Sequence, residues 1–381
     1  MKISIIGSTK PGYKLPKEEA IDFSGKSAGI CYMPEDLNTL FSEASEKTTK
    51  RAESTLKSGH HSVYDHPVYN LALENIPKIL AIILNNEKMY TTSEKSARYT
   101  KMTPSPEEST LYEKWITIYK EVISNLYPTL KEKQVEKLAQ ENARYLISVF
   151  TPSTIMEHTL SLRQINYIYN WFTDYIENAE DNEFNKLLKP CMKEFIDSFP
   201  PIILNNLSSK DKNRKLSLFA TRSRKEEFGE NYSTNYYATF AEFAQAQRHR
   251  TLDYEISLDE HPKFYVPLCI RGTKYEKEWL TDISSLSSRF PQGMLVKINE
   301  RGTVENFVLK CKERLCGCAQ LEIMLQTKET LDKYIDSVKT DNPEIYSYLL
   351  NYESGVRCSF KDFNCTAPCI WGSKNSLNRL I

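Results

Sequence analysis

The sequence has little glycine, no excess of charge of either sign and no long hydrophobic run. Only 12 of its 381 residues are Gly, and neither GxxxxGK followed by Ser or Thr nor GxGxxG occurs, so the common glycine-rich phosphate loops are excluded. Lys and Arg number 50, as do Asp and Glu, which argues against binding to a nucleic-acid backbone. The longest apolar run, Ile79–Leu84, cannot span a bilayer. We expect neither a nucleic-acid nor a membrane partner.

The nine Cys are an odd number in a chain that is too long to need disulfide staples. The segment Met1–Ile5 lacks the features of a signal peptide. We therefore expect a reducing cytoplasm. At roughly 150 residues per domain, the length favours two to three domains. Asn205–Lys215 reads as a linker, and Tyr352–Ile381 reads as a separate Cys-rich tail.

Hydrophobic periodicity and capping residues predict the secondary structure of the chain. We expect a strand over 2–6, a strand and then a helix over 68–84, and helices over 37–58, 105–126, 132–150, 153–176, 233–250 and 304–326.

Four short segments concentrate residues that can carry chemistry. Gly59–His66 holds three His, a Ser and an Asp, which suit a polar ligand or a metal, or simply a capped turn. Ser96 and Arg98 would point the same way in an extended segment and could clamp a phosphate, although a polar surface strand explains them too. Gln245–Arg250 ends in two Arg around a His, which suits phosphates or FAD, or compensates a helix dipole. Arg314–Ile323 is the fourth segment, a predicted helix with small residues.

Six of the nine Cys form two groups, Cys311-x4-Cys316-x-Cys318 and Cys358-x6-Cys365-x3-Cys369. Neither spacing is the paired C-x2-C of a zinc ribbon. A shared structural Zn or iron–sulfur site and reduced, packed thiols both stay open. The candidate metal ligands are Cys316, Cys318, Cys358, Cys365 and Cys369.

Together these segments resemble the flavin-dependent thymidylate synthase (ThyX-like) family. That family carries GH-x-S/T-x-x-EH, then Q-x-x-RHR with S-x-RY after it, E-x-AR, and finally an Arg before AQ-x-EI. The first half of this chain has Gly59–His66, Ser96-x-Arg98-Tyr99 and Glu141–Arg144, but Asn86–Lys88 replaces the RHR. The second half has Gln245–Arg250, Arg314 and Ala319–Ile323, but no S-x-RY.

The losses are complementary, because each half keeps the set of motifs that the other lacks. In the family, one active site takes these sets from different subunits. The resemblance therefore implies a diverged tandem fusion of two ThyX-like α+β halves, each with a small antiparallel sheet and long helices, forming a pseudo-dimer. The expected domains are 1–205, 206–350 and the Cys-rich tail 351–381. A homodimer would then restore a pseudo-tetramer.

The resemblance also implies a reaction and its residues. We expect reductive methylation of dUMP at C5 by an FAD enzyme that uses NADPH and methylenetetrahydrofolate. The implied nucleotide-binding residues are Ser96, Arg98, Arg144, Gln245, Arg248 and Arg314, of which Arg248 and Arg314 are catalytic. The implied FAD-binding residues are His249, Arg250, Glu94, Arg163 and His60.

Departures from the family pattern keep two other functions open. Asp253 stands where the family has Ser, and Cys318 stands where it has His. A related pyrimidine-nucleotide methylase or hydroxymethylase is the nearest enzymatic alternative. A non-catalytic nucleotide-binding or assembly protein is the alternative from another class.

Overall fold

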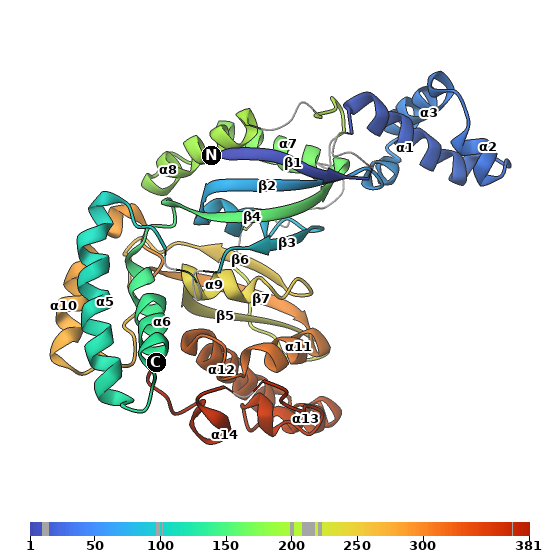
Figure 1. The fold of residues 1–381 in the computed structure, drawn as a ribbon. Coiled ribbons are helices and arrows are strands. Elements are labelled where there is room, and N and C mark those ends of the chain that lie inside the picture. The colour runs from blue at the N-terminus through green and yellow to red at the C-terminus, as the bar shows by residue number, and fades with distance from the viewer. Residues whose placement is uncertain are drawn as a thin grey trace. The chain divides into compact units, whose positions relative to one another are not determined.

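The computed structural model describes residues 1–9, 15–96, 100, 102–198, 202–207, 218–219, 223–367 and 369–381, except for the side chains at 153 and 374. The chain divides into two compact units. Figure 1 labels the helices and strands. Unit 1 comprises Met1–Lys95 and Phe150–Lys215, and unit 2 comprises Ser96–Val149 and Leu216–Ile381. Residues 96–149 thus pack with the C-terminal part of the chain. The division at 205 and 350 concerns repeated halves and stays a prediction.

Unit 1 is built on a four-stranded antiparallel sheet in the order β1-β2-β4-β3. Its strands are β1 (Lys2–Ser8), β2 (Val68–Pro77), β3 (Thr91–Glu94) and β4 (Pro152–Ser161). Its helices are α1 (Lys17–Tyr32), α2 (Leu37–Phe41), α3 (Ser45–Lys57), α4 (Lys78–Leu84), α7 (Leu162–Asn178) and α8 (Glu183–Asp197), with a 3-10 turn over His61–Asp65. The predicted strand over 2–6 and the strand and helix over 68–84 are confirmed.

Unit 2 contains a three-stranded antiparallel sheet in the order β5-β7-β6. Its strands are β5 (Asn231–Thr239), β6 (Asp253–Ser257) and β7 (Leu295–Thr303). Its helices are α5 (Pro106–Leu126), α6 (Glu132–Ala143), α9 (Phe240–Ala246), α10 (Lys274–Ser285), α11 (Val304–Arg314), α12 (Leu321–Val338), α13 (Pro343–Leu349) and α14 (Gly372–Asn375). Short 3-10 turns lie over Arg144–Leu146, Ser287–Arg289, Leu350–Tyr352 and Arg357–Ser359.

The same order of elements occurs in both units. In each, a long strand leads into a seven-residue helix, a short strand follows, and a later strand inserts between the two. The inserted strands, β4 and β7, each continue directly into a helix. Small antiparallel sheets with many helices confirm the predicted α+β class.

Polar N-caps fix the points where strands turn into helices. The side chains of Ser161, Thr239 and Thr303 accept hydrogen bonds from backbone N–H groups three residues ahead, at the starts of α7, α9 and α11. Two predicted helices therefore begin too early. Residues 152–161 and 231–239 are strands. In the second strand every other side chain, at Tyr232, Thr234 and Tyr236, is buried.

Three other predicted helices are interrupted. The helix over 37–58 divides into α2 and α3, and the helix over 132–150 ends at Ala143. The helix over 304–326 breaks between Arg314 and Leu321, because the backbone there bends around Gly317. A Cβ atom on Gly317 would lie 2.6 Å from the sulfur of Cys369, so this turn needs glycine.

The helix predicted over 105–126 is confirmed as α5, and it supplies much of the core of unit 2. Trp115 and Tyr119 of α5 and Trp279 of α10 are fully buried. The rings of Trp115 and Trp279 meet edge to face with centroids 4.8 Å apart. This aromatic packing links residues before 150 to residues after 216 and explains why they form one unit.

Candidate active site

Residues from both halves of the sequence meet at the side chain of Gln320, the residue directly before α12 in unit 2. Its Oε1 accepts hydrogen bonds from Nη2 of Arg144 and from Nε2 of Gln245. Gln320 and Arg144 are buried. Nε of Arg144 and Oε1 of Gln245 are also buried, and neither has a hydrogen-bond partner. The cluster therefore holds one unpaired donor and one unpaired acceptor.

A second layer of hydrogen bonds fixes Gln320 in turn. Its Nε2 donates to the hydroxyl of Tyr145, which donates to Oε2 of Glu322 at 2.7 Å. Glu322 accepts from the backbone N–H and the hydroxyl of Thr239, both at 2.9 Å. Burial raises the pKa of Glu322, although the Thr239 and Tyr145 bonds oppose that shift. This layer ties the N-terminus of α12 to the N-terminus of α9.

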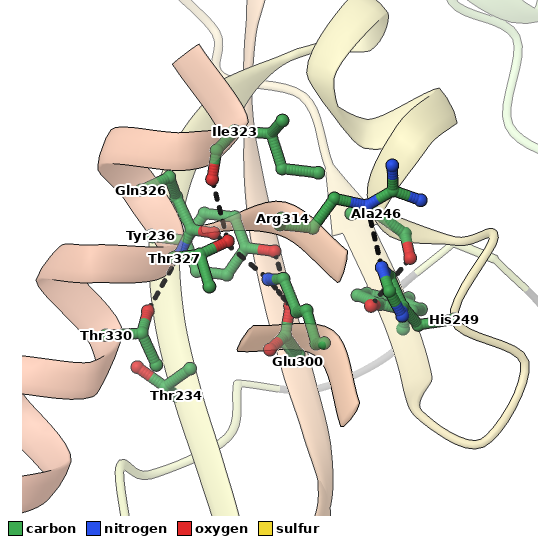
Figure 2. A network of polar contacts seen from close by, with 12 residues as sticks. Thr234, Tyr236, Ala246, His249, Glu300, Arg314, Ile323, Gln326, Thr327 and Thr330 are labelled. Carbon is green, nitrogen blue, oxygen red and sulfur yellow. Dashed lines mark hydrogen bonds and ion pairs between the residues drawn. The ribbon is translucent and has the colours of Figure 1, made fainter. Parts of the chain in front are cut away.

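Arg314, the last residue of α11, lies against the end of α9 (Figure 2). Its Nε donates to Nε2 of His249 at 2.7 Å, and its Nη2 donates to the carbonyl of Gln245 at 3.1 Å. The orientation of the guanidinium group is therefore fixed by two bonds to the segment Gln245–Arg250.

His249 is a neutral acceptor in this arrangement. Burial lowers its pKa to about 2, and the nearby cations Arg314 and Lys310 add to the shift. Because Nε2 accepts the proton of Arg314, the ring proton must sit on Nδ1. His249 is therefore a fixed polar group, and it does not titrate at physiological pH.

The other residues predicted to bind the nucleotide, together with Arg250, lie in unit 2 or outside the described residues. Arg248 and Arg250 are exposed on either side of the buried His249. The carbonyl of Ser96 accepts from the N–H of Thr100 at 3.1 Å and from its hydroxyl at 2.7 Å. Arg98 lies outside the described residues. The structure thus brings Arg144, Gln245 and Arg314 together.

Three predicted FAD-binding residues lie in unit 1, where each contacts a neighbouring side chain. Glu94 pairs with Lys78 at 2.6 Å. Arg163 pairs with Asp65 at 2.8 Å, within the family-like segment after α3. Nδ1 of His60 shares a hydrogen bond with the hydroxyl of Tyr32. Their roles toward FAD stay predictions.

A buried polar group lies beside the Arg314 cluster and was not among the predicted site residues. Glu300 of β7 accepts from Nζ of Lys310 at 2.6 Å and from the hydroxyls of Tyr232 and Tyr236 at 2.8 and 2.7 Å. Figure 2 shows Glu300 and Tyr236 of this group. Glu242 of α9 is fully buried, and neither carboxylate oxygen has a hydrogen-bond partner. Burial raises the pKa of Glu242 to about 8, so it holds a proton at neutral pH.

The residues that sequence reasoning missed are the ones that connect the site. Gln320 and Glu322 stood within the recognised segment Ala319–Ile323, so a signal existed for them. Tyr145 follows directly after Arg144. Only the tertiary contacts identify Thr239 and Glu242, since nothing in their local sequence marks a polar partner.

The predicted metal ligands all lie in unit 2, around the turn that follows α11 and the segment after Arg357. These five cysteines and the other four of the chain are all free thiols. Among the described residues, no three His, Cys, Asp or Glu side chains converge closely enough to hold a single metal ion.

The sequence matches one family model, described as thymidylate synthase complementing protein, over residues 19–201. A flavin-dependent thymidylate synthase of Thermococcus onnurineus is 26% identical over 154 residues. That match covers 37% of this chain and 61% of the relative, so the chain spans less than two thirds of the relative's length.

Two crystal structures of ThyX from Helicobacter pylori, both with FAD and dUMP, are also similar. One superposes with a TM-score of 0.32 at 18% identity over 52% of this chain and 94% of its own. The other gives 0.33 at 17% identity over 54% and 99%. At these scores no site geometry is transferred from either structure.

No helix in the described part of the chain is both long and apolar enough to cross a membrane. The stretch matched by the family model contains the motifs at Gly59–His66 and Glu141–Arg144. Over residues 19–201 the chain therefore resembles the thymidylate synthase complementing protein family, and it is similar to a flavin-dependent thymidylate synthase.

Proposed function

We propose that this chain is an FAD-dependent enzyme that reductively methylates dUMP at C5, with methylenetetrahydrofolate as carbon donor and NADPH as reductant. The observation that carries the proposal is the contact of Arg144 with Gln245 through Gln320. Arg144 belongs to the motif set kept in the first half, and Gln245 belongs to the set kept in the second. Random loss of motifs from an inactive enzyme does not explain why one copy of each motif set is kept and why the two sets are in contact.

The cluster suits the polar edge of a pyrimidine. Uracil presents an N–H donor between two carbonyl acceptors, and the cluster holds an unpaired donor on Arg144 and an unpaired acceptor on Gln245. A buried polar atom without a partner costs about 1–3 kcal/mol. A small movement that lets a nucleotide pair with both atoms would recover that free energy. Arg314, fixed by His249, would stabilise negative charge on the pyrimidine as C5 becomes nucleophilic.

The segment after α9 suits the phosphates of a dinucleotide. Arg248 and Arg250 are exposed guanidinium groups around a buried, neutral imidazole, and guanidinium pairs bind phosphate with charge-assisted hydrogen bonds. We therefore assign FAD binding to His249 and Arg250, with Arg248 and Ser96 toward the nucleotide. Bound FAD would supply the redox chemistry, carrying reducing equivalents from NADPH to the one-carbon unit.

The tandem-fusion hypothesis belongs to this proposal. It is supported by the shared strand order β2-β4-β3 and β5-β7-β6, and by the seven-residue helix after the first strand of each. In this view the halves 1–205 and 206–350 each descend from one ThyX-like chain. A homodimer would then provide four halves, and Arg98, Glu94, Arg163 and His60 would complete the sites.

The test is an assay of the purified full-length protein for flavin and for turnover. We expect acid extraction to release FAD, and mass spectrometry to show dTMP formed from dUMP in the presence of methylenetetrahydrofolate and NADPH. Arg314→Ala should lower kcat/KM for dUMP at least 100-fold, because the fixed guanidinium is lost. Arg271→Ala removes an exposed arginine of the same unit and should change kcat/KM for dUMP less than two-fold.

Other results would replace the proposal. A product of different mass, or turnover of dCMP in place of dUMP, would indicate a related pyrimidine-nucleotide enzyme. Binding of dUMP by a protein that neither contains nor takes up FAD would indicate the nucleotide-binding or assembly role.

A further inference from the structure

Cysteines from two distant parts of unit 2 surround one hollow. Cys316 and Cys318 lie in the turn between α11 and α12. Cys358 lies in the 3-10 turn Arg357–Ser359, and Cys365 and Cys369 follow that turn. All five line a cavity of about 260 Å³. Free cysteine is usually a small buried hydrophobic residue, so five around one exposed hollow require another explanation.

The two segments that carry these cysteines pack against each other. Cys369 in turn packs on the turn that carries Cys316, since its sulfur would be 2.6 Å from a Cβ atom on Gly317. Thiolates gathered around one cavity repel one another unless a cation compensates them.

The turn that carries Cys316 is held rigidly. Arg379, 4% exposed, donates from Nη1 to the carbonyl of Gly317 and from Nη2 to that of Ala319, both at 2.6 Å. The N–H of Arg357 donates to the carbonyl of Leu315 at 2.6 Å, which joins the tail segment to this turn. The backbone that presents the cysteines is therefore fixed from both sides.

Two further groups suit a negatively charged thiolate centre. The backbone N–H of Cys318 lies 3.5 Å from the sulfur of Cys316 and donates to it. Hydrogen bonds of this kind stabilise sulfur ligands and tune the potential of iron–sulfur centres. The guanidinium group of Arg357, stacked 3.9 Å from the centre of the Phe363 ring, lines the same cavity.

The arrangement distinguishes a single ion from a cluster. Tetrahedral zinc with Zn–S bonds of about 2.3 Å requires its sulfurs to lie roughly 3.8 Å apart around one point. In the described part of the chain no three ligand-type side chains converge in that way. The thiols are instead spread around a hollow, which is the arrangement a polynuclear cluster needs, because each iron contributes its own cysteine bond.

We propose that Cys316, Cys358, Cys365 and Cys369 bind a four-iron, four-sulfide cluster, with Cys318 supplying a backbone hydrogen bond to a ligand sulfur. The cluster tethers the Cys-rich tail to the turn that leads into Gln320. Its binding displaces the thiol protons, and the iron supplies the charge that the four thiolates lack. This inference does not depend on the proposed methylation reaction.

The test measures iron and acid-labile sulfide in full-length protein expressed with added iron and purified without oxygen. Bound flavin contributes to neither quantity. We expect about four iron and about four sulfide per chain. Cys358→Ser and Cys369→Ser should each lower both values at least five-fold, whereas Cys31→Ser, an exposed cysteine of α1, should leave them unchanged.

A second measurement uses the unaltered protein, in case the variants do not fold. Iodoacetamide labelling mapped by mass spectrometry should modify Cys31 rapidly and spare Cys358 and Cys365, although both are exposed. Oxidation in air followed by chelation should then open Cys358 and Cys365 to labelling. Three results would overturn the assignment. The first is iron and sulfide below about a tenth of these values after reconstitution, and the second is equal labelling before and after chelation. The third is one zinc per chain that is lost in the same variants.

Discussion

Arg144 and Gln245 donate hydrogen bonds to the same oxygen atom, Oε1 of Gln320. One residue follows α6 and the other lies in α9, so the contact joins the first and second halves of the sequence within unit 2. The shared acceptor sets the spacing of two groups that we assign to the nucleotide. Gln320 is thus a positioning residue for both.

Replacement of Gln320 should therefore weaken nucleotide binding without unfolding the protein. We expect Gln320→Ala to raise the Kd for dUMP about 10-fold or more, since both donors lose their common acceptor. Isothermal titration calorimetry measures this value. Gln140→Ala, on the half-exposed side of α6, is the matched control and should change Kd less than two-fold. An unchanged Kd for Gln320→Ala would separate this cluster from the nucleotide site.

Glu242 should make unit 2 less stable as the pH rises. Its pKa is about 8 in the folded protein and near 4.5 in the unfolded chain, so above pH 4.5 the folded state binds more protons than the unfolded state. The free energy of unfolding should then fall by several kcal/mol between about pH 4.5 and pH 8. Urea titrations at pH 5 and pH 8 should show that Glu242→Gln stabilises the protein more at pH 8. Glu305→Gln, an exposed carboxylate of α11, should show no such difference.

His158 should act in the opposite direction in unit 1. It is fully buried on β4, stacked on Tyr90 with ring centroids 5.1 Å apart, and neither ring nitrogen has a hydrogen-bond partner. Burial lowers its pKa to about 3 from a usual 6.5. Below pH 6.5 the unfolded chain binds the extra proton, so stability should be lost as the pH falls from about 6.5 to 3.

His158→Phe keeps an aromatic ring against Tyr90 and removes the titrating group. The variant should lose part of the acid sensitivity, measured as the pH midpoint of unfolding followed by circular dichroism. His261→Phe changes an exposed histidine of unit 2 and should leave that midpoint in place. Equal midpoints for His158→Phe and the unaltered protein would contradict the assignment.

The buried pair of Lys310 and Glu300 should respond strongly to the loss of one partner. Both side chains are fully inaccessible to solvent. Lys310→Met leaves the buried Glu300 carboxylate with tyrosine hydroxyls but without the Lys310 cation, and we expect a loss of about 3–5 kcal/mol in the free energy of unfolding. Lys312 lies on the same helix as Lys310 and forms a partly exposed pair with Asp362. Lys312→Met breaks that pair and should lower the free energy of unfolding by less than about 1 kcal/mol. Urea titration compares the two. Similar losses for both would mean that burial does not govern this pair.

Local sequence determined the elements whose signals lie within a few residues. The helix predicted over 105–126 is α5, and it begins at a capping pattern of Ser105, Pro106 and Glu108, in which the N–H of Ser105 donates to Glu108 at 2.8 Å. Local periodicity failed at 233–250, because the apolar side chains of Tyr237, Phe240 and Phe243 fit a helical face while the backbone up to Thr239 is a strand. Pairing with β7 decides that strand, and pairing partners are distant in sequence.

For the candidate site too, part could be predicted from the sequence and part could not. The resemblance to the ThyX-like family singled out Arg144, Gln245 and Arg314, and the spacing of the Cys residues singled out the cysteines. Only the tertiary structure could show that Gln320 joins Arg144 to Gln245, that His249 is a neutral acceptor, and that four cysteines share one cavity. Those properties depend on burial and on contacts between segments far apart in the chain, and both arise only when the chain folds.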